Sequence, residues 1–326
     1  MRKMRSAEKV DIFNPKNQLK LYGYENYFSI FAEIFKKKEI PSSYLISGPK
    51  GIGKSTFIYH FINYLLSKNE NNQYLKESFE INFDNSSYKL LAENIHPNFY
   101  LLDTNKDSNN IKIDQVRNLI QFTNKSAYSK EIKIVMIDNA ENLNLNSSNA
   151  LLKSIEEASQ NTFFFIIHNS SYKILNTIKS RCIEFKIFFS ELEKKNILNK
   201  LISQNGFELD EDFIYRDLYF DTPGNLLNFS LLTKECPDDT NKDNLSIILY
   251  LMDKFRNDKK KEILFFLSLL IDKFYNYLCL KNNRKIYNYF FNHKKILNII
   301  YNMKKYNLDE KISFVLIKNI LINETK

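Results

Sequence analysis

The sequence predicts an α/β domain built on a parallel sheet, followed by two domains made only of helices. In the first half, short runs of strand-forming residues alternate with segments of helical pattern. After about residue 188 the strand pattern disappears, and helical periodicity continues to the last of the 326 residues. Alternation of strands and helices is typical of a parallel sheet flanked by helices.

Five runs in the first half have the composition of strands. Residues 163–167 contain only Phe and Ile, and a run without polar residues is typical of a strand buried on both faces. The other runs are short and rich in β-forming residues. The expected strands are Tyr44–Ser47, Phe99–Leu102, Ile132–Asp138, Thr162–Ile167 and Cys182–Ile187.

Helical patterns lie between these strands. We expect helices over Thr56–Ser67, Ile113–Phe122 and Ser147–Glu157. Residues 67–95 are polar and rich in Asn, so we expect an insertion or mobile loop there.

The second half contains interruptions that divide it. Ser190 has the character of a helix N-cap, and Pro223-Gly224 and the residues 236–240 (C-P-D-D-T) break the helical pattern. We therefore expect an α/β domain over residues 1–188, a small helical domain over 189–238 and an all-helical domain over 239–326.

The composition excludes several classes of protein. No apolar run approaches the roughly 20 residues of a membrane span. The charged residues 1–6 lack the apolar stretch of a secretory signal. Cys182, Cys236 and Cys279 are too scattered for a zinc cluster or a disulfide framework. We expect a soluble cytoplasmic protein with no zinc and no membrane partner.

The net charge of the chain is +9 and its pI is about 9.1. An acidic partner such as nucleic acid would account for this excess. Enrichment in Lys, Asn and Ile from an AT-rich genome would account for it equally. Because the basic residues are spread along the chain, composition favours the second explanation. The one dense run, residues 254–261, includes an acid and is typical of a solvated helix junction.

A phosphate-binding motif follows the first expected strand. The residues G-P-K-G-I-G-K-S match the pattern G-x-x-x-x-G-K-[ST] in full. In this motif the backbone N–H groups of the loop bind phosphates. Lys54 would reach the β/γ oxygens, and Ser55 would give its hydroxyl to Mg²⁺. A glycine-rich turn with a chance lysine is the alternative. It is disfavoured because three of only six glycines lie here, between a strand and a helix. The expected nucleotide-binding residues are Gly48, Pro49, Lys50, Gly51, Ile52, Gly53, Lys54, Ser55 and Thr56.

Asp138 ends the third expected strand, where P-loop ATPases place an acid that organises Mg²⁺. The alternative is a polar residue where a strand meets a loop. Active enzymes often follow this acid with a second one that orients the attacking water, but the next residue here is Asn139. Glu141 would share the face of Asn139 only if the backbone were extended, and otherwise it is a surface acid. The pattern predicts nucleotide binding with weak or absent turnover.

Several further motifs follow the phosphate loop in order. They are H-P-N at 96–98, N-A-L-L-K-S-I-E-E at 149–157, Asn169, and S-R-C at 180–182. Over about residues 20–187, these motifs and their order resemble the clamp-loader branch of the AAA+ ATPases, which includes bacterial DNA polymerase III subunits and eukaryotic replication factor C. Asn169 falls at the sensor 1 position, and the resemblance implies a contact with the γ-phosphate.

In the family, the arginine of the S-R-C motif projects into the nucleotide site of a neighbouring subunit. A guanidinium there neutralises charge that builds up in the transition state. The resemblance therefore implies that Arg181 is a finger acting in trans. From its chemistry alone, a surface salt bridge would be the favoured role. We expect Cys182 to be a small buried residue, His96 a turn residue and His168 a strand-end or core residue, none of them catalytic.

Three departures from the gamma/tau pattern indicate resemblance to delta-prime-type subunits instead. Residues 56–98 contain no cysteine, whereas gamma/tau has a four-cysteine zinc module in this region. Asn139 replaces the gamma/tau glutamate. Residues 222–225 (T-P-G-N) resemble the S-P-G-R of delta-prime relatives, with Asn225 in place of the arginine.

The resemblance implies an AAA+ P-loop domain, a helical lid and a helical C-terminal collar. Such a chain would join gamma/tau and delta subunits in a hetero-pentamer that loads a sliding clamp onto primer–template DNA. It would bind ATP or ADP with Mg²⁺ through Lys54, Ser55 and Asp138, with weak or no hydrolysis of its own. Residues 264–271 and 296–300 would pack in the domain core and between subunits. The alternatives are an active motor subunit of the gamma/tau or replication factor C small-subunit type, and a nucleotide-binding regulator outside replication.

Overall fold

The computed structural model describes residues 14–37, 40–104, 110–125, 132–159, 161–205, 222–233, 236, 244–259 and 261–325. The chain divides into two compact units, the first made of Met1–Glu208 and Phe220–Leu227 and the second of Leu209–Tyr219 and Asn228–Lys326. Helix α7 (Glu191–Asn205) belongs to the first unit, and α9 (Pro223–Thr233) begins in the first and ends in the second. The division into three domains stays a prediction.

The first unit contains a five-stranded, fully parallel sheet in the order β2-β3-β4-β1-β5. β1 pairs with both β4 and β5, and Ser47 is the partner of His168 on one side and of Lys186 on the other. The five expected strands are confirmed, with bounds that differ by at most two residues. They are β1 (Ser43–Gly48), β2 (Phe99–Leu102), β3 (Lys133–Ile137), β4 (Thr162–Asn169) and β5 (Ile183–Lys186).

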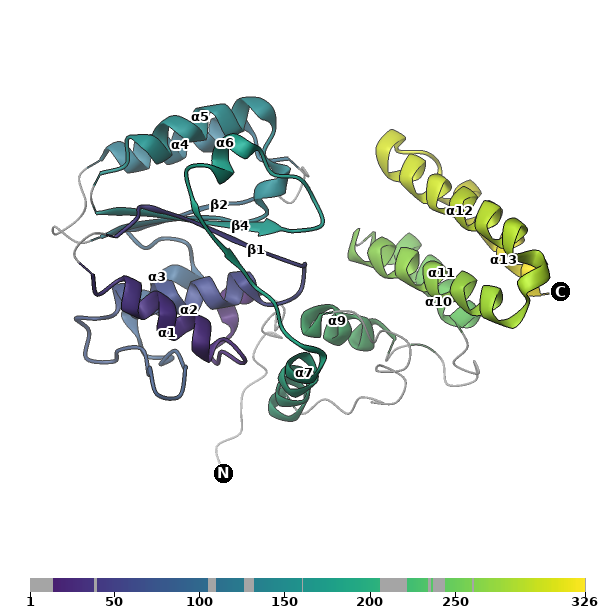
Figure 1. Ribbon diagram of the computed structural model, residues 1–326, viewed down its shortest axis with the longest axis horizontal. Helices are drawn as coiled ribbons and strands as arrows, with labels where there is room; N and C mark the ends of the chain where they lie inside the picture. The colour runs from purple at the N-terminus through teal and green to yellow at the C-terminus, as the bar shows by residue number, and fades with distance from the viewer. Residues whose placement is uncertain are drawn as a thin grey trace. The chain divides into compact units, whose positions relative to one another are not determined.

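Alternate side chains of the central strands enter two separate core clusters, one on each face of the sheet. In β4, Phe163 and Phe165 join one cluster, and Phe164 and Ile166 join the other. Every residue of β1, β3 and β4 is buried, as expected for strands covered on both faces. The helices α1 (Glu25–Ile34), α2 (Lys54–Leu66) and α3 (Ser86–Ala92) cover the first face, and α4 (Ile113–Asn124), α5 (Leu145–Glu156) and α6 (Asn176–Lys179) the second (Figure 1).

Residues 67–95 contain α3 and core side chains packed against the first face, so the expectation of a mobile loop was wrong, and that of an insertion stays a prediction. The ring of Tyr74 stacks on Phe28 with 5.2 Å between centroids, and Ile81 is buried in the same cluster. Asn85 caps α3, because its side-chain oxygen accepts hydrogen bonds from Tyr88 N at 2.7 Å and from Asn63 Nδ2 at 3.1 Å. Asn85 is therefore buried and bonded, whereas Asn71, Asn72 and Asn94 of the same segment are exposed.

Among its described residues, the second unit consists of helices and the short connections between them. Its buried residues include Leu251, Leu267, Ile296 and Ile317, one from each of its four long helices. The contacts run from α10 to α11, from α11 to α12 and from α12 to α13. These helices are α10 (Asn244–Asp258), α11 (Lys261–Lys281), α12 (Ile286–Tyr306) and α13 (Glu310–Thr325).

One helix in the described part of the chain is long and apolar enough to cross a membrane, judged by length and composition. It is the segment Ile263–Lys281 of α11, with a mean hydropathy of 1.6. The expectation that no run approaches a membrane span was wrong on these criteria. Half of the segment is buried inside the protein, and the core helix of a helical bundle passes the same test, so this observation is weak support for a membrane span.

Candidate nucleotide-binding site

The phosphate loop lies between the end of β1 and the start of α2. Gly51 has φ +78° and Gly53 has φ +100°, backbone conformations that favour glycine. Gly53 is the N-cap of α2, so the first N–H groups of this helix have no partner within the helix. Loop amides and a helix N-terminus together form an arrangement suited to an anion. The structure thus brings the expected residues 48–56 together at one strand end.

The Lys54 side chain is folded back onto its own loop. Its Nζ donates hydrogen bonds to the backbone oxygens of Gly48 at 2.8 Å and of Pro49 at 2.7 Å, and it is only 6% exposed. Burial lowers the pKa of this ammonium to about 8, and the carboxylates of Asp138 and Glu141 oppose the shift. The cation is therefore held inside the loop, next to the place where phosphate oxygens would bind.

Ser55 and Asp138 form the second part of the site. Ser55 Oγ donates to Asp138 Oδ2 at 2.7 Å, which joins the start of α2 to the residue after β3. Burial, with the nearby carboxylate of Asp103, raises the pKa of Asp138 to about 6. A hydroxyl and a carboxylate are oxygen ligands of the kind that Mg²⁺ takes. Within the described ranges, no group of three or more His, Cys, Asp or Glu is arranged to hold a metal.

The chain turns immediately after Asp138. Asn139 has φ +53° and is followed by a 3₁₀ turn, Ala140–Asn142, so the extended path that would align Glu141 with Asn139 does not occur. Glu141 is not a free surface acid either, because its Oε2 accepts a hydrogen bond from Asn169 N at 3.0 Å. Asn139 Nδ2 donates to Asp103 Oδ1 at 2.8 Å.

Asp103 belongs to this group of residues and was missed from the sequence. It follows β2 directly, and β2 is the sheet neighbour of β3, which Asp138 follows. The sequence does show an acid at the end of an expected strand. That acid can be assigned to the site only when β2 is known to lie beside β3, and the sequence pattern did not predict the strand order.

Asn169 lies at the end of β4, beside the start of the phosphate loop. Its register partner in β1 is Gly48, and it is 9% exposed. Its Oδ1 accepts a hydrogen bond from Ser171 N at 3.2 Å. His168 and His96 are buried in a strand end and in the turn before β2, as expected. The sensor role of Asn169 stays a prediction.

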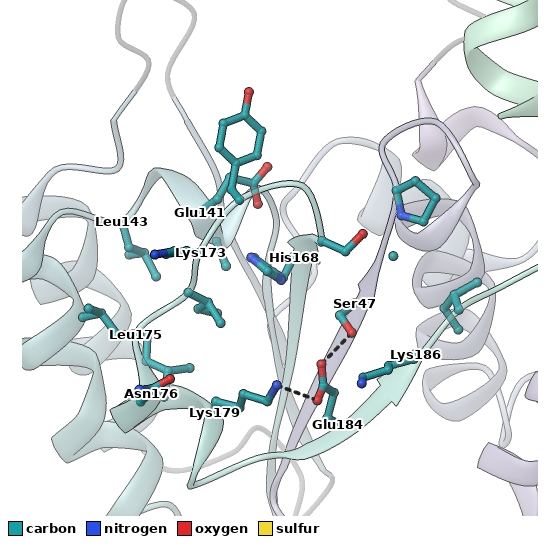
Figure 2. Close-up of a pocket in the computed structure, with 18 of the residues that line it drawn as sticks. Ser47, Glu141, Leu143, His168, Lys173, Leu175, Asn176, Lys179, Glu184 and Lys186 are labelled. Carbon is teal, nitrogen blue, oxygen red and sulfur yellow. Dashed lines mark hydrogen bonds and ion pairs between the residues drawn. The ribbon is translucent and has the colours of Figure 1, made fainter. Parts of the chain in front are cut away.

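A cavity of about 990 Å³ opens beside Gly48 and Pro49 (Figure 2). Its wall carries a chain of polar contacts in which Ser47 Oγ donates to Glu184 Oε1 at 2.8 Å and Lys179 pairs with Glu184 at 3.0 Å. The cavity is lined in part by residues of β1, β4, β5 and α6. Polar and apolar side chains therefore both surround the start of the phosphate loop.

Arg181 lies at the end of the strands opposite to the phosphate loop. It precedes β5, whereas the phosphate loop follows β1, and these two strands are parallel neighbours. Its guanidinium pairs with Glu156 and donates to Thr177 O at 3.0 Å, and its side chain is 36% exposed. The structure therefore does not bring Arg181 into the nucleotide site of its own chain. The half-buried Cys182 beside it has its thiol pKa raised to about 12 by burial, which fits an unreactive residue.

The T-P-G-N segment contacts the phosphate loop within the first unit. Thr222 Oγ1 donates to Lys50 O at 2.8 Å, and Gly224 N donates to Gly51 O at 2.9 Å. Asn225, at the position of the family's lid arginine, directs its Nδ2 toward Lys50 O at 3.4 Å.

The sheet order, the phosphate loop and the Ser55–Asp138 pair define a P-loop domain of the AAA+ class, followed by helical segments, and the expected fold is confirmed. Residues 23–190 match the family described as DNA polymerase III, delta subunit. The chain belongs to this family, in which it is similar to delta-prime clamp-loader subunits.

The curated relatives include delta-prime and gamma subunits of DNA polymerase III. The delta-prime subunit of Pseudomonas aeruginosa is 31% identical over 48% of this chain and 46% of the relative. That of Buchnera aphidicola subsp. Acyrthosiphon pisum is 27% identical over 74% of each chain. The gamma subunit of Buchnera aphidicola subsp. Schizaphis graminum is 26% identical over 61% of this chain and 53% of the relative. Apart from the second of these, the chain spans about half the length of the relatives that it matches.

Among solved structures, a DNA polymerase III gamma subunit-related protein from Thermotoga maritima has a similar fold. It superposes with a TM-score of 0.51 at 17% identity, over 92% of this chain and 99% of that one. This level of identity supports the fold alone.

Proposed function

We propose that this chain is a delta-prime-type subunit of a DNA polymerase III clamp loader that supplies Arg181 to the nucleotide site of a neighbouring gamma/tau subunit. The observation that carries the proposal is the position of Arg181. Its side chain is exposed at the end of the strands opposite to the chain's own phosphate loop, where a neighbouring subunit can reach it. A guanidinium beside a transferring phosphoryl group stabilises the charge of the transition state.

The chain itself binds ATP or ADP with Mg²⁺ in this proposal. Lys54 and the loop amides hold the phosphates, and Ser55 and Asp138 hold the metal ion. Mg²⁺ would neutralise the charge of the β- and γ-phosphates. The complete phosphate-binding motif and the 2.7 Å contact between Ser55 and Asp138 support this assignment.

Hydrolysis by this chain is proposed to be weak or absent. Asn139 stands where a second acid would orient water, and its amide is engaged by Asp103. Glu141, the nearest alternative acid, accepts the hydrogen bond of Asn169 N. Neither side chain is placed to act as the acid that orients an attacking water.

The proposed partners are gamma/tau and delta subunits in a hetero-pentamer, together with the sliding clamp and primer–template DNA, in the cytoplasm. The identity of the relatives as DNA polymerase III subunits supports this assembly. The exposed apolar side chains on α12 and α13 are a candidate surface for these subunit contacts, among them Phe290, Phe291, Ile312 and Val315.

The test is DNA- and clamp-stimulated ATP turnover of a loader reconstituted with gamma/tau and delta. We expect Arg181→Ala to lower turnover severalfold with assembly intact, because a trans arginine is worth about 10³-fold or more at the one site it serves. Arg117→Ala is the matched control, since Arg117 is also exposed and paired with an acid, Asp114. Equal turnover for wild type and Arg181→Ala would refute the finger.

The alternative function is an active motor subunit, which the intact phosphate loop and the similarity to a gamma subunit favour. It requires steady ATP turnover by the chain alone that Lys54→Ala abolishes. Our proposal expects no such turnover, but a rise in melting temperature with Mg-ADP in wild type and none in Lys54→Ala. Lys153→Ala, which changes an exposed lysine, is the control.

A further inference from the structure

Two consecutive carbonyl groups of the phosphate loop receive hydrogen bonds from the T-P-G-N segment. Lys50 O accepts from Thr222 Oγ1 at 2.8 Å and from Asn225 Nδ2 at 3.4 Å. Gly51 O accepts from the backbone N–H of Gly224 at 2.9 Å. Thr222 and Asn225 are 4% and 6% exposed, so the side chains that make these contacts are buried.

The next carbonyl of the loop is held from another direction. Ile52 O accepts a hydrogen bond from the hydroxyl of Tyr24 at 3.1 Å. Tyr24 is 2% exposed, and its ring is stacked on Phe57 with 4.8 Å between centroids. Packing fixes the ring, and the ring fixes the position of the hydroxyl.

These contacts determine the direction of the loop amides. In a planar trans peptide, the carbonyl oxygen of one residue and the N–H of the next point to opposite sides. Donors that hold the carbonyls of residues 50–52 therefore turn the N–H groups of Gly51, Ile52 and Gly53 the other way. In a P-loop, phosphate is bound by such backbone N–H groups.

The contact between the two segments is too close for larger residues. A Cβ on Gly51 would lie 2.4 Å from Thr222 Oγ1 and 2.6 Å from Asn225 Oδ1. A Cβ on Gly224 would lie 2.6 Å from Gly51 O. Both glycines allow the backbone of the T-P-G-N segment to reach the backbone of the loop.

We infer that Thr222, Gly224 and Asn225, here called the lid clamp, act with Tyr24 to hold the phosphate loop in its anion-binding conformation. These are positioning residues, which act on the phosphates of a nucleotide through the loop amides. In this inference, Asn225 bonds to the backbone of the loop and does not bind the phosphate directly. The inference rests on the proposed nucleotide binding and adds the residues that organise it.

Coupling of this kind is reciprocal. If the lid clamp favours the loop conformation that binds phosphate, then bound phosphate favours the lid clamp by the same free energy. Binding of Mg-ADP is therefore expected to slow hydrogen exchange at the Gly224 amide, which donates to Gly51 O. A purely structural contact would exchange at the same rate with and without nucleotide.

The experiment measures the affinity for Mg-ADP and for inorganic pyrophosphate by calorimetric titration of the full chain. Thr222→Val and Tyr24→Phe each remove one hydroxyl donor and keep the side-chain shape. We expect each to weaken both ligands about fivefold, the effect of one net hydrogen bond. Thr222→Ser keeps the hydroxyl and should bind as wild type does. Thr233→Val is the matched control, because Thr233 donates only to carbonyls of its own helix, Phe229 O and Ser230 O.

The outcomes separate the two proposals. Weakened binding in Thr222→Val and Tyr24→Phe, with Thr233→Val unchanged, supports the lid clamp. Wild-type affinity in all variants overturns the lid clamp and leaves nucleotide binding in place. If the wild-type chain binds neither Mg-ADP nor pyrophosphate, nucleotide binding is refuted and the lid clamp with it.

Discussion

The side-chain amide of Asn139 lies 2.8 Å from Asp103 Oδ1 and joins the ends of two neighbouring strands. Asn139 has φ +53°, a conformation that Asn tolerates better than most residues. Asp103 also accepts a hydrogen bond from Thr104 N. Asn139 stands at the position of a water-orienting acid, but here it connects the ends of β2 and β3.

This bridge predicts that Asn139→Glu will not create an ATPase. The new carboxylate would lie beside Asp103 and Asp138, and the bridge would be lost. We expect the free energy of unfolding to fall by about 1–3 kcal/mol, measured by urea denaturation, with no rise in turnover of the isolated chain. Adding Asp103→Asn should recover part of the loss. Asn146→Glu, at an exposed position in α5, is the control. Turnover that appears with Asn139→Glu would contradict this prediction.

Removal of the Ser55 hydroxyl should separate metal binding from nucleotide binding. In Ser55→Ala, the affinity for ADP in the presence of Mg²⁺ is expected to fall about tenfold, toward the value in EDTA, because Asp138 loses its 2.7 Å partner and Mg²⁺ loses a ligand. Isothermal titration with and without Mg²⁺ measures this difference. Ser268→Ala removes a hydroxyl that bonds to a helix carbonyl and should change nothing. An undiminished response to Mg²⁺ in Ser55→Ala would exclude Ser55 as a ligand.

The packing of residues 67–95 depends on Asn85. This fully buried side chain accepts two hydrogen bonds and donates one to Asn72 O at 2.7 Å. Asn85→Ala is expected to lower the free energy of unfolding by about 2–3 kcal/mol, since it removes a helix cap and leaves buried polar groups unpaired. Thermal denaturation measures the loss, with Asn71→Ala at an exposed site as the control. A loss no larger than that of Asn71→Ala would mean that this segment does not support the fold.

Acid should destabilise the first unit through His60. Burial lowers the pKa of this histidine to about 3, while its hydrogen bond with Gln18 O opposes the shift. The ordinary pKa of His is about 6.5, so the unfolded chain takes up a proton below that pH and the folded chain does not. The stabilisation by neutral His60 is thus present above about pH 6.5 and is lost toward pH 3, with a slope approaching 1.4 kcal/mol per pH unit.

Urea denaturation at several pH values between 7.5 and 4.5 measures this slope. The pH dependence of His60→Gln should be shallower than that of wild type. Parallel curves for wild type and His60→Gln would show that other groups control acid stability.

The local features of this protein were predictable because they depend on residues close together in the sequence. The buried run at 163–167 became β4, and the phosphate-binding motif lies between a strand and a helix as its pattern requires. Helical periodicity likewise indicated the helices of the second half. The resemblance to clamp-loader subunits rested on the same kind of contiguous motif, and the family match confirmed it.

The features that were missed depend on contacts between distant parts of the chain. The polar composition of residues 67–95 indicated a loop, but Tyr74 stacks on Phe28 of α1 and the buried Asn85 bonds to Asn63 of α2. The position of Glu141 depended on a left-handed Asn139, which no periodicity reveals. The 19-residue segment of α11 is interrupted near its middle by Asp272, Lys273 and Asn276, so a search for uninterrupted apolar runs did not find it.

The sequence by itself determined the strands, the helices, the phosphate loop and the family. The tertiary structure decided the strand order β2-β3-β4-β1-β5, which places Asp103 beside Asp138, and the approach of Thr222 to Lys50. The reason is that strand and helix patterns arise from the periodicity of neighbouring residues, whereas strand order and loop contacts depend on pairing between segments up to 175 residues apart. The same difference applies to Arg181. Its motif could be recognised in the sequence, but only the fold placed it at the end of the strands away from its own phosphate loop.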